Sequence, residues 1–324
     1  MTRHTKSVLL VAIAAAFAVS YFSVQFNRYY LGIAIDIGIN IILAVSLNLI
    51  NGHTGQFSLG HAGFMAVGAY TAASFTWAMQ AAKTSPLMAE IIFACALLVG
   101  GVVAAVVGLG VGVPTLRLRG DYLAIVTLGF GEIIRVVLQT TDSLAKHFSV
   151  SVAPILENMG GASGMKGIAT LTSFGWAWAL AAVTVFVIAS LVNSTYGRGF
   201  IAVHDDEVAA SAMGINPTRY KVTAFVIGAF FAGVAGGLYA HHKQFLSPTG
   251  FDFMKSIDIV VMVILGGMGR TIGVILAAII LTVLPELLRG FADYRMIIYS
   301  LLIIGLMMAR PQGLFTFGGK KAKV

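Results

Sequence analysis

Two strongly apolar runs of this chain are separated by a polar island, Gly197-Arg-Gly-Phe-Ile-Ala-Val-His-Asp-Asp-Glu-Val-Ala-Ala-Ser-Ala-Met-Gly-Ile-Asn-Pro217. Asp205 and Asp206 supply N-cap side chains for a helix. Glu207 places a carboxylate in the first turn of that helix, where the helix dipole favours negative charge. The island therefore predicts a helix outside the membrane, between two apolar spans.

The predicted helix is short and carries little side-chain bulk. Ala209 and Ala210 lie on it, Gly214 can end it, and Asn216-Pro217 prevents its continuation. A short helix with small side chains, placed between two membrane spans, is suited to contact by another protein. We call residues 197–219 the coupling segment, and they predict a transporter subunit that a soluble partner drives.

The composition is that of a membrane protein. Of the 324 residues, 58% are hydrophobic and 10% are charged, whereas a soluble domain carries about 25% charged residues. The net charge of +8 does not indicate nucleic-acid binding, because the basic residues lie at the ends of apolar runs. We expect an all-α polytopic membrane protein in which residues 1–324 form a single transmembrane domain surrounded by membrane lipid.

Apolar windows predict about ten transmembrane helices, since about 20 apolar residues cross a bilayer. The windows are residues 8–26, 29–50, 57–80, 90–113, 121–141, 174–193, 222–240, 256–268, 271–288 and 294–309. Residues 16–18 resemble a signal-peptidase site, but the apolar run continues to Phe26 and favours an uncleaved first helix. The window 256–268 is either a half-span or is joined to the next helix by a break at residues 266–269.

The Lys and Arg residues predict the orientation. With both termini in the cytoplasm, twelve of them lie on the inner side and eight on the outer side, as the positive-inside rule favours. The coupling segment is then cytoplasmic, where ATP is available. Residues 141–173 form the longest outer connection, which we expect to be a flexible loop that can fold against a partner.

A second polar stretch opens the third window and reads Asn51-Gly-His-Thr-Gly-Gln-Phe-Ser-Leu-Gly-His-Ala-Gly63. Irregular polar backbone at membrane depth is tolerated only where it is buried in protein or lines a wet cavity. We therefore expect Gln56, Ser58 and His61 to lie along a translocation path or to pack against it. The alternative is a cytoplasmic loop followed by an ordinary helix.

A few ionisable and amide side chains fall inside the predicted spans. Glu132 and Arg135 are three residues apart, so they share one helix face, and either charge alone would be costly there. They predict a polar lining that tolerates a zwitterionic solute, or else an ion pair that locks the helix bundle. Asp36, Asn40 and Asn48 are further interior polar candidates.

The glycine and proline positions predict helix packing. Gly108 with Gly112, and Gly233 with Gly237, are spaced so that two helix backbones can approach closely in lipid. Tight packing within this one subunit is the simpler interpretation. Of the seven prolines, only Pro285 falls well inside a window, where we expect it to kink the helix.

The sequence carries no signature of enzymatic or metal chemistry. It has no G-x-S-x-G turn and no Walker A motif, and residues 160–167 lack the ending of a phosphate loop. One cysteine, Cys95, excludes an intramolecular disulfide and any cysteine-based zinc site. His241-His242-Lys243 lacks a third metal ligand, which favours an interfacial loop. We expect no enzyme activity, no metal and no cofactor in this chain.

Four ordered motifs resemble those of branched-chain amino-acid ABC transporter permeases of the LivM type. Residues 51–70 resemble the G-x-x-G-Q-x-S-L-G-H-A-x-F signature, and residues 119–135 look like the LivM-type signature. The coupling segment is similar to the EAA-type motif that docks on an ATPase. Residues 266–273 resemble the Gly-Gly-x-Gly motif, without the proline that usually follows it. The resemblance runs from about residue 29 to residue 313.

The resemblance implies the permease subunit of a bacterial inner-membrane importer with a type II-like architecture. It implies a second permease of the LivH type, two ATPases that hold ATP and Mg²⁺, and a periplasmic amino-acid-binding protein as partners. The motifs and the interior positions above give two sets of candidate residues. Those for ATPase coupling are Asp206, Glu207, Ala209, Ala210 and Gly214. Those for the translocation path or helix packing are Asn48, Gln56, Ser58, His61, Thr127, Glu132 and Arg135.

Three alternatives remain at this point. A urea or other amide ABC permease is a related family, although residues 120–132 favour the amino-acid branch. An ion-coupled secondary carrier would use Asp36 and Glu132 as coupling carboxylates at broken helices and would need no ATPase. An integral membrane enzyme is disfavoured because His, Asp and Glu do not cluster at the span ends.

Overall fold

The computed structural model describes residues 27–81, 84–115, 121–145, 153–291, 294–309 and 313. The first predicted span, residues 8–26, and both termini lie outside the described residues. Throughout the described ranges the regular elements are helices. One isolated antiparallel bridge pairs Met165 with Leu246. The predicted all-helical class is therefore confirmed.

Six helical segments within the described residues are long and apolar enough to cross a membrane. They are Arg28–His53, Pro86–Thr115, Tyr122–Gln139, Phe174–Val192, Pro217–Lys243 and Thr271–Gly290. Three further windows correspond to helices outside this set, namely α3 (His61–Ala78), α12 (Phe253–Gly266) and α14 (Arg295–Ala309). The molecule is a multi-pass membrane protein, and the total of about ten spans stays a prediction.

Helix α11 (Pro217–Lys243) packs at the centre of the bundle against α3 and α4 (Pro86–Thr115). Glycine makes this close crossing possible. A Cβ atom at Gly68 of α3 would lie 2.2 Å from the Cα atom of Gly233, and one at Gly236 would lie 2.0 Å from the Met65 carbonyl oxygen. A predicted pairing residue of α4, Gly108, faces Ala229 of α11 in the same way. These small residues therefore serve packing within the chain.

Two broken helices meet beside this core. Helix α2 (Arg28–Asn48) continues into a π-helical turn, η2 (Leu49–His53), before the chain becomes irregular. Helix α12 ends at the glycine pair Gly267 and Gly269, whose φ angles are +92° and +78°, and α13 (Thr271–Leu287) follows. Such positive φ angles favour glycine. The predicted break at residues 266–269 is confirmed.

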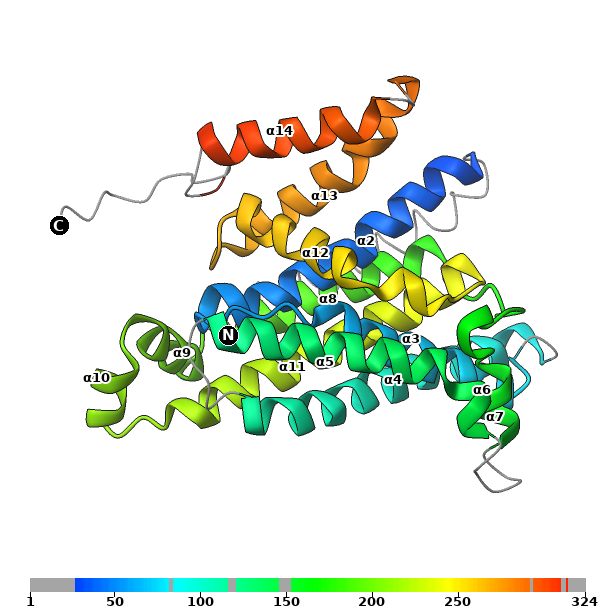
Figure 1. The fold of residues 1–324 in the computed structure, drawn as a ribbon, viewed down its shortest axis with the longest axis horizontal. Helices are drawn as coiled ribbons and strands as arrows, with labels where there is room; N and C mark the ends of the chain where they lie inside the picture. Colours follow the sequence, from blue (N-terminus) through cyan, green and yellow to red (C-terminus); the bar gives the residue numbers. More distant parts are fainter. Residues whose placement is uncertain are drawn as a thin grey trace.

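The elements at the two ends of the bundle differ. Helices α9 (Thr195–Asp205) and α10 (Glu207–Ala212) lie at one end, and α6 (Thr141–Ala145) and α7 (Ala153–Asn158) lie at the opposite end (Figure 1). Helices α5 (Asp121–Gln139) and α8 (Phe174–Val192) run between the two ends. The coupling segment and the predicted outer connection are therefore on opposite sides.

The described parts of the connection 141–173 are hydrogen-bonded to their own chain, while the predicted flexibility of this connection stays a prediction. Met165 and Leu246 exchange two backbone hydrogen bonds of 2.8 and 3.0 Å. The Thr172 hydroxyl donates to the Leu238 carbonyl oxygen at 2.9 Å, which ties the end of the connection to α11. The sequence concealed this because backbone pairing leaves no side-chain pattern.

Candidate functional site

The connection between α2 and α3 forms a largely buried polar segment, residues 49–60. This polar segment lies in contact with both broken helices, α2 and α12. The Asn48 side-chain oxygen accepts a hydrogen bond of 2.9 Å from the Gly269 backbone N–H. A Cβ atom at Gly52 would lie 2.2 Å from both the Asn48 Oδ1 and the Gly269 N atoms. Only glycine fits at position 52, so the break in α2 and the break after α12 are held in contact.

Hydrogen bonds from the backbone define the path of the polar segment. The Gln56 N–H donates to the Ile50 carbonyl oxygen at 3.1 Å, and the Ser58 N–H donates to the Asn51 side-chain oxygen at 3.2 Å. At the start of α3, the His61 Nε2 atom lies 2.9 Å from the Ser46 hydroxyl. The segment therefore doubles back against the last turns of α2.

Thr127 reaches the same place from α5. Its hydroxyl accepts a hydrogen bond of 3.1 Å from the Leu59 N–H, and a Cβ atom at Gly60 would lie 2.5 Å from the Thr127 carbonyl oxygen. Five of the seven residues predicted for the path or for packing thus lie in the polar segment or directly beside it. They are Asn48, Gln56, Ser58, His61 and Thr127, and all five are buried.

Several buried polar atoms of this segment lack a hydrogen-bond partner within the described residues. They are Asn48 Nδ2, Asn51 Nδ2, His53 Nε2, Gln56 Nε2 and Oε1, Ser58 Oγ and His61 Nδ1. A buried polar group left without a partner costs about 1–3 kcal/mol. The segment is therefore chemically suited to hold water or polar solute groups, or to exchange partners when the helices move.

The remaining two predicted residues lie further along α5 than Thr127. Glu132 and Arg135 pair with each other at 2.7 Å on α5, with 33% and 26% of their side chains exposed. Their neighbours Ile133 and Val136 are exposed apolar residues. In the described residues no hydrogen bond links Glu132 or Arg135 to the polar segment, although Gly131 beside them lies close to Gly60. Their contact with solute stays a prediction.

The coupling segment folds around a helix cap. The Asp206 carboxylate accepts hydrogen bonds from the Val208 and Ala209 N–H groups at 2.8 and 3.0 Å. These bonds favour the ionised carboxylate and lower the pKa of Asp206. Asp206 is therefore the N-cap of α10, as predicted, but the same prediction for Asp205 is wrong because Asp205 is the last residue of α9.

Helix α10 ends where the sequence predicted. Gly214 follows the helix and has a φ angle of +82°. Asn216 then caps the next helix by accepting from the Arg219 N–H at 3.2 Å, and Pro217 takes the first position of α11. The Asn-Pro pair thus starts a helix as well as ending one, which agrees with the preference of proline for the first turn.

Helix α10 and the residue that follows it expose apolar side chains next to small ones. Val208 is 69% exposed and Met213 is 84% exposed. Ala209 is exposed, while Ala210 is buried against the bundle. Such exposed apolar side chains beside small ones are typical of a surface that another protein covers.

Glu207 anchors this surface to the bundle. Its carboxylate pairs with Lys221 of α11, a side chain that is only 8% exposed. Neither the pairing with Lys221 nor helix α9 was predicted from the sequence. The two paired residues are 14 positions apart in different helices, so no short-range spacing pointed to the pair.

The coupling segment touches the polar segment directly. Gly55 has a φ angle of +67°, and a Cβ atom there would lie 2.5 Å from the His204 Nδ1 atom of α9. The two stretches that the sequence singled out for separate reasons are therefore neighbours in the fold.

Charged residues also meet at the other end of α11. Asp36 of α2 pairs with Lys243 at 2.8 Å, and its other oxygen lies 3.7 Å from the His242 Nε2 atom. The expectation of an interfacial loop at residues 241–243 is wrong, because they form the last turn of α11. His241 is buried and lies 2.9 Å from the Thr76 hydroxyl. Across the part of the chain that the structure describes, no group of three or more His, Cys, Asp or Glu side chains could hold a metal ion.

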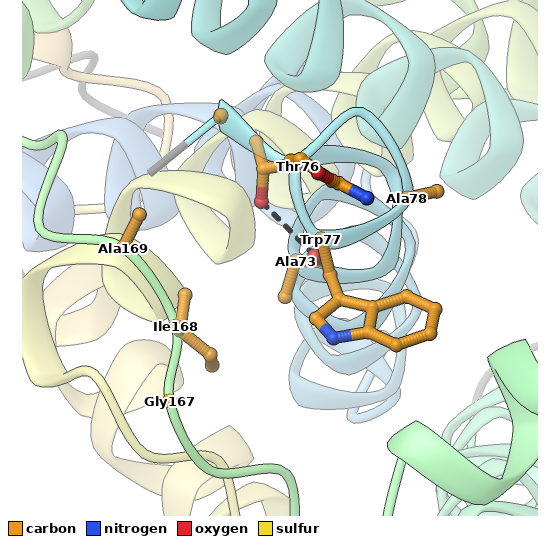
Figure 2. Close-up of a pocket in the computed structure, with 9 residues that line it drawn as sticks. Ala73, Thr76, Trp77, Ala78, Gly167, Ile168 and Ala169 are labelled. Atoms are coloured by element: carbon orange, nitrogen blue, oxygen red, sulfur yellow. Dashed lines mark hydrogen bonds between the residues drawn. The ribbon is translucent and has the colours of Figure 1, made fainter. Parts of the chain in front are cut away.

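A pocket of about 380 Å³ lies near the end of α3. Ile168 and Ala169 of the outer connection face Ala73 and Thr76 across it, and Trp77 lies along it (Figure 2). Among the residues that the structure describes, none that lines this pocket is charged.

Comparison with known proteins assigns this architecture to a family. Residues 29–309 match the family described as "Branched-chain amino acid transport system / permease component". The chain belongs to this family. It is 36% identical to the LivM permease protein of a high-affinity branched-chain amino acid transport system from Salmonella typhimurium, and 37% identical to that of Escherichia coli. Each alignment covers 95% of this chain and 73% of the relative.

A second kind of permease is also similar to this chain. The LivH permease protein of Escherichia coli is 30% identical over 138 residues, which is 42% of this chain and 43% of the relative. No solved structure matches the fold.

Proposed function

We propose that this chain is the permease subunit of an ATP-driven importer for branched-chain amino acids, with other hydrophobic amino acids as further solutes. The observation that carries the proposal is the match to permease components over residues 29–309, together with 36–37% identity to LivM proteins. As in the resemblance drawn from the sequence, a homologous second permease of the LivH type would complete the membrane part.

The coupling segment receives the ATPases in this proposal. Three features support it: exposed apolar side chains at Val208 and Met213, the small residue Ala209 between them, and a location at one end of the bundle (Figure 1). Two separate ATPase subunits hold ATP and Mg²⁺. The segment is then on the cytoplasmic side, and both chain termini share that side.

The contact between Gly55 and His204 gives a route for the coupled motion. Closure of the ATPases pushes α9 and α10, and α9 abuts the polar segment at Gly55. The polar segment in turn holds the break after α12 through the bond between Asn48 and Gly269. A displacement of the coupling segment thus reaches both broken helices, which open or close the path.

The opposite end of the bundle receives the solute. The connection 141–173 and the end of α11 lie there (Figure 1). A periplasmic binding protein docks on this end and supplies the affinity for the amino acid, so the permease does not need a tight site of its own.

The secondary-carrier alternative is not favoured. The two carboxylates that a carrier would use are each paired with a basic residue, Asp36 with Lys243 and Glu132 with Arg135. The family match also favours the amino-acid permease over a urea or amide permease.

Purification from native membranes tests the proposal. We expect the tagged chain, solubilised in mild detergent, to bring down two ATPases and a second permease, as identified by mass spectrometry. Substitution of Glu207→Lys together with Ala209→Asp should remove the ATPases and retain the second permease. Recovery of the chain alone, stable and monodisperse, would contradict the proposal, as would full ATPase recovery and full uptake with the double variant.

A further inference from the structure

The exposed faces of helices α4 and α5 differ in chemistry. The middle of α4 exposes aliphatic side chains, among them Leu98, Val102 and Val106, and residues 91–115 include no Asp, Glu, Lys or Arg. Such a face suits contact with lipid. Helix α5, which runs across the front of the bundle (Figure 1), also exposes the aliphatic residues Ile125 and Ile133, but it carries a charged pair beside them.

The ion pair of Glu132 and Arg135 lies at membrane depth. Helix α5 has 19 residues, Asp121–Gln139, so at about 1.5 Å per residue Glu132 lies about 3 Å from its midpoint. Both side chains stay partly exposed at the surface of the described chain. Charged side chains at the centre of a bilayer are costly against hydrocarbon, and they face protein or water instead. Lipid therefore does not cover this part of α5.

Two glycines of α5 show which of its sides is used within this chain. Gly131 packs on α3, because a Cβ atom at Gly63 would lie 2.9 Å from the Gly131 Cα atom. A Cβ atom at Gly129, in contrast, would meet no atom of the described residues within 4 Å. Residues two apart point to nearly opposite sides of a helix, so Gly129 lies on the side away from α3. A glycine that is open in this way lets a second helix approach closely.

We propose that the second permease docks on this side of α5 within the membrane, an inference that rests on the proposed function. The docking surface, called the α5 face, consists of Ile125, Gly129, Glu132, Ile133 and Val136. These residues recur at intervals of three or four positions, so they share one side of the helix. The partner covers this face with an apolar helix. It places a neutral hydrogen-bonding side chain opposite the ion pair, because the pair has no net charge.

The depth of the α5 face decides between its possible occupants. The ATPases and the binding protein contact the two ends of the bundle in the proposed function, so they do not reach the middle of a span. The first predicted span, residues 8–26, is joined to α2 at Asn27. The described helices that pack on α5 are α3, α4, α6 and α12, and α2 is not among them. The second permease brings its own spans into the bilayer and can cover a face at this depth.

Site-specific photo-crosslinking tests the proposal on the complete complex of both permeases and both ATPases in lipid nanodiscs. The photoreactive residue p-benzoylphenylalanine replaces Val137, an exposed side chain at the edge of the α5 face where a larger group has room. Illumination should join this chain to the second permease, and mass spectrometry identifies the joined peptides. The same probe in place of Val102 on α4 should give no crosslink to the second permease.

Matched substitutions measure what the α5 face contributes to assembly. Ile133 and Val102 are 60% and 53% exposed near the middle of their helices. Ile133→Trp forces a bulky ring against the partner and should lower the recovery of the second permease in a pull-down at least about tenfold. Val102→Trp should leave that recovery unchanged. Glu132→Leu combined with Arg135→Leu should also lower it, because the polar group of the partner loses its hydrogen bonds.

The outcomes separate this surface from the proposed function. A crosslink from position 137 only to lipid or only to residues 8–26 would overturn the α5 face while leaving the importer function intact, as would unchanged recovery with Ile133→Trp. If the unaltered chain brings down no second permease, the proposed function fails, and the surface fails with it. The crosslink changes a single exposed position, so it decides the question even if a variant of the ion pair does not fold.

Discussion

The polar segment 49–60 and the coupling segment 197–219 look alike in sequence and differ in the fold. Both are short, rich in glycine and polar groups, and both separate apolar runs. The polar segment is buried with polar atoms left over, whereas the coupling segment is exposed and its α10 is capped by its own Asp206. One glycine of each segment shows the difference, since the Asn48 side chain and the Gly269 backbone crowd Gly52 while Gly214, beside the exposed α10, has open space around it. The comparison teaches that a polar stretch can serve either packing or docking.

The largest expected effect is at the crowded glycine. Gly52→Ala places a methyl group against the Asn48 side chain and the Gly269 backbone, and it should destabilise the protein by about 3 kcal/mol. Gly214→Ala, the matched control, meets no atom within 4 Å and should cost about 1 kcal/mol through backbone strain alone. Thermal unfolding of the detergent-solubilised protein measures both. Equal losses would remove the distinction between the two segments.

The next effect concerns docking rather than stability. Val208→Asp combined with Met213→Asp puts charge on the most exposed part of the coupling segment. We expect ATPase association to weaken at least about tenfold, while the melting temperature stays unchanged because surface substitutions cost little. Pull-down of the ATPases by the tagged permease measures the association. A lowered melting temperature with normal association would show that these side chains support the fold and not a partner.

A smaller effect is expected for the anchor of the coupling segment. Glu207→Gln leaves the buried Lys221 without its counter-charge and should destabilise the protein by about 1 kcal/mol, since the carboxylate itself is partly exposed. Lys221→Met combined with Glu207→Gln should recover most of that loss. A double-mutant cycle of unfolding free energies measures the coupling. A coupling of zero would mean that the pair does not fix α10 to the bundle.

The smallest effect is the pH dependence of the α10 cap. The pKa of Asp206 is lowered in the fold from its ordinary value of 3.8. The cap therefore stabilises α10 at pH values above 3.8 and is lost as the pH falls through the lowered folded pKa. Hydrogen exchange at Val208 and Ala209, corrected for intrinsic rates, should show loss of protection in that acid range. Asp206→Asn keeps an acceptor without titrating, and equal acid loss in this variant would contradict the assignment.

The sequence predicted those parts of the fold that depend on local pattern. Apolar length predicted the long helices, and the glycines at 266–269 predicted the break before α13. Cap chemistry predicted α10 at Asp206, because an N-cap is a contact between residues two or three positions apart. The motif that contains Gln56, Ser58 and His61 was recognised as unusual for the same local reason.

The rest of the site depends on contacts between distant residues. Ser46 meets His61, Lys221 meets Glu207, and Gly55 meets His204, and no sequence spacing indicates these pairs. The ion pair between Glu132 and Arg135 was suggested by its helical spacing, but its distance from the polar segment depends on how α5 packs. Tertiary packing thus decides which candidate residues form one site and which stand apart.

ATP-dependent uptake of leucine in proteoliposomes tests the central claim most directly. The vesicles contain this chain, the second permease and the two ATPases, with the binding protein added outside and ATP enclosed. We predict leucine accumulation that requires both ATP and the binding protein and that the Val208→Asp, Met213→Asp variant abolishes. Leucine accumulation by this chain alone, driven by an ion gradient without ATPases, would contradict the account.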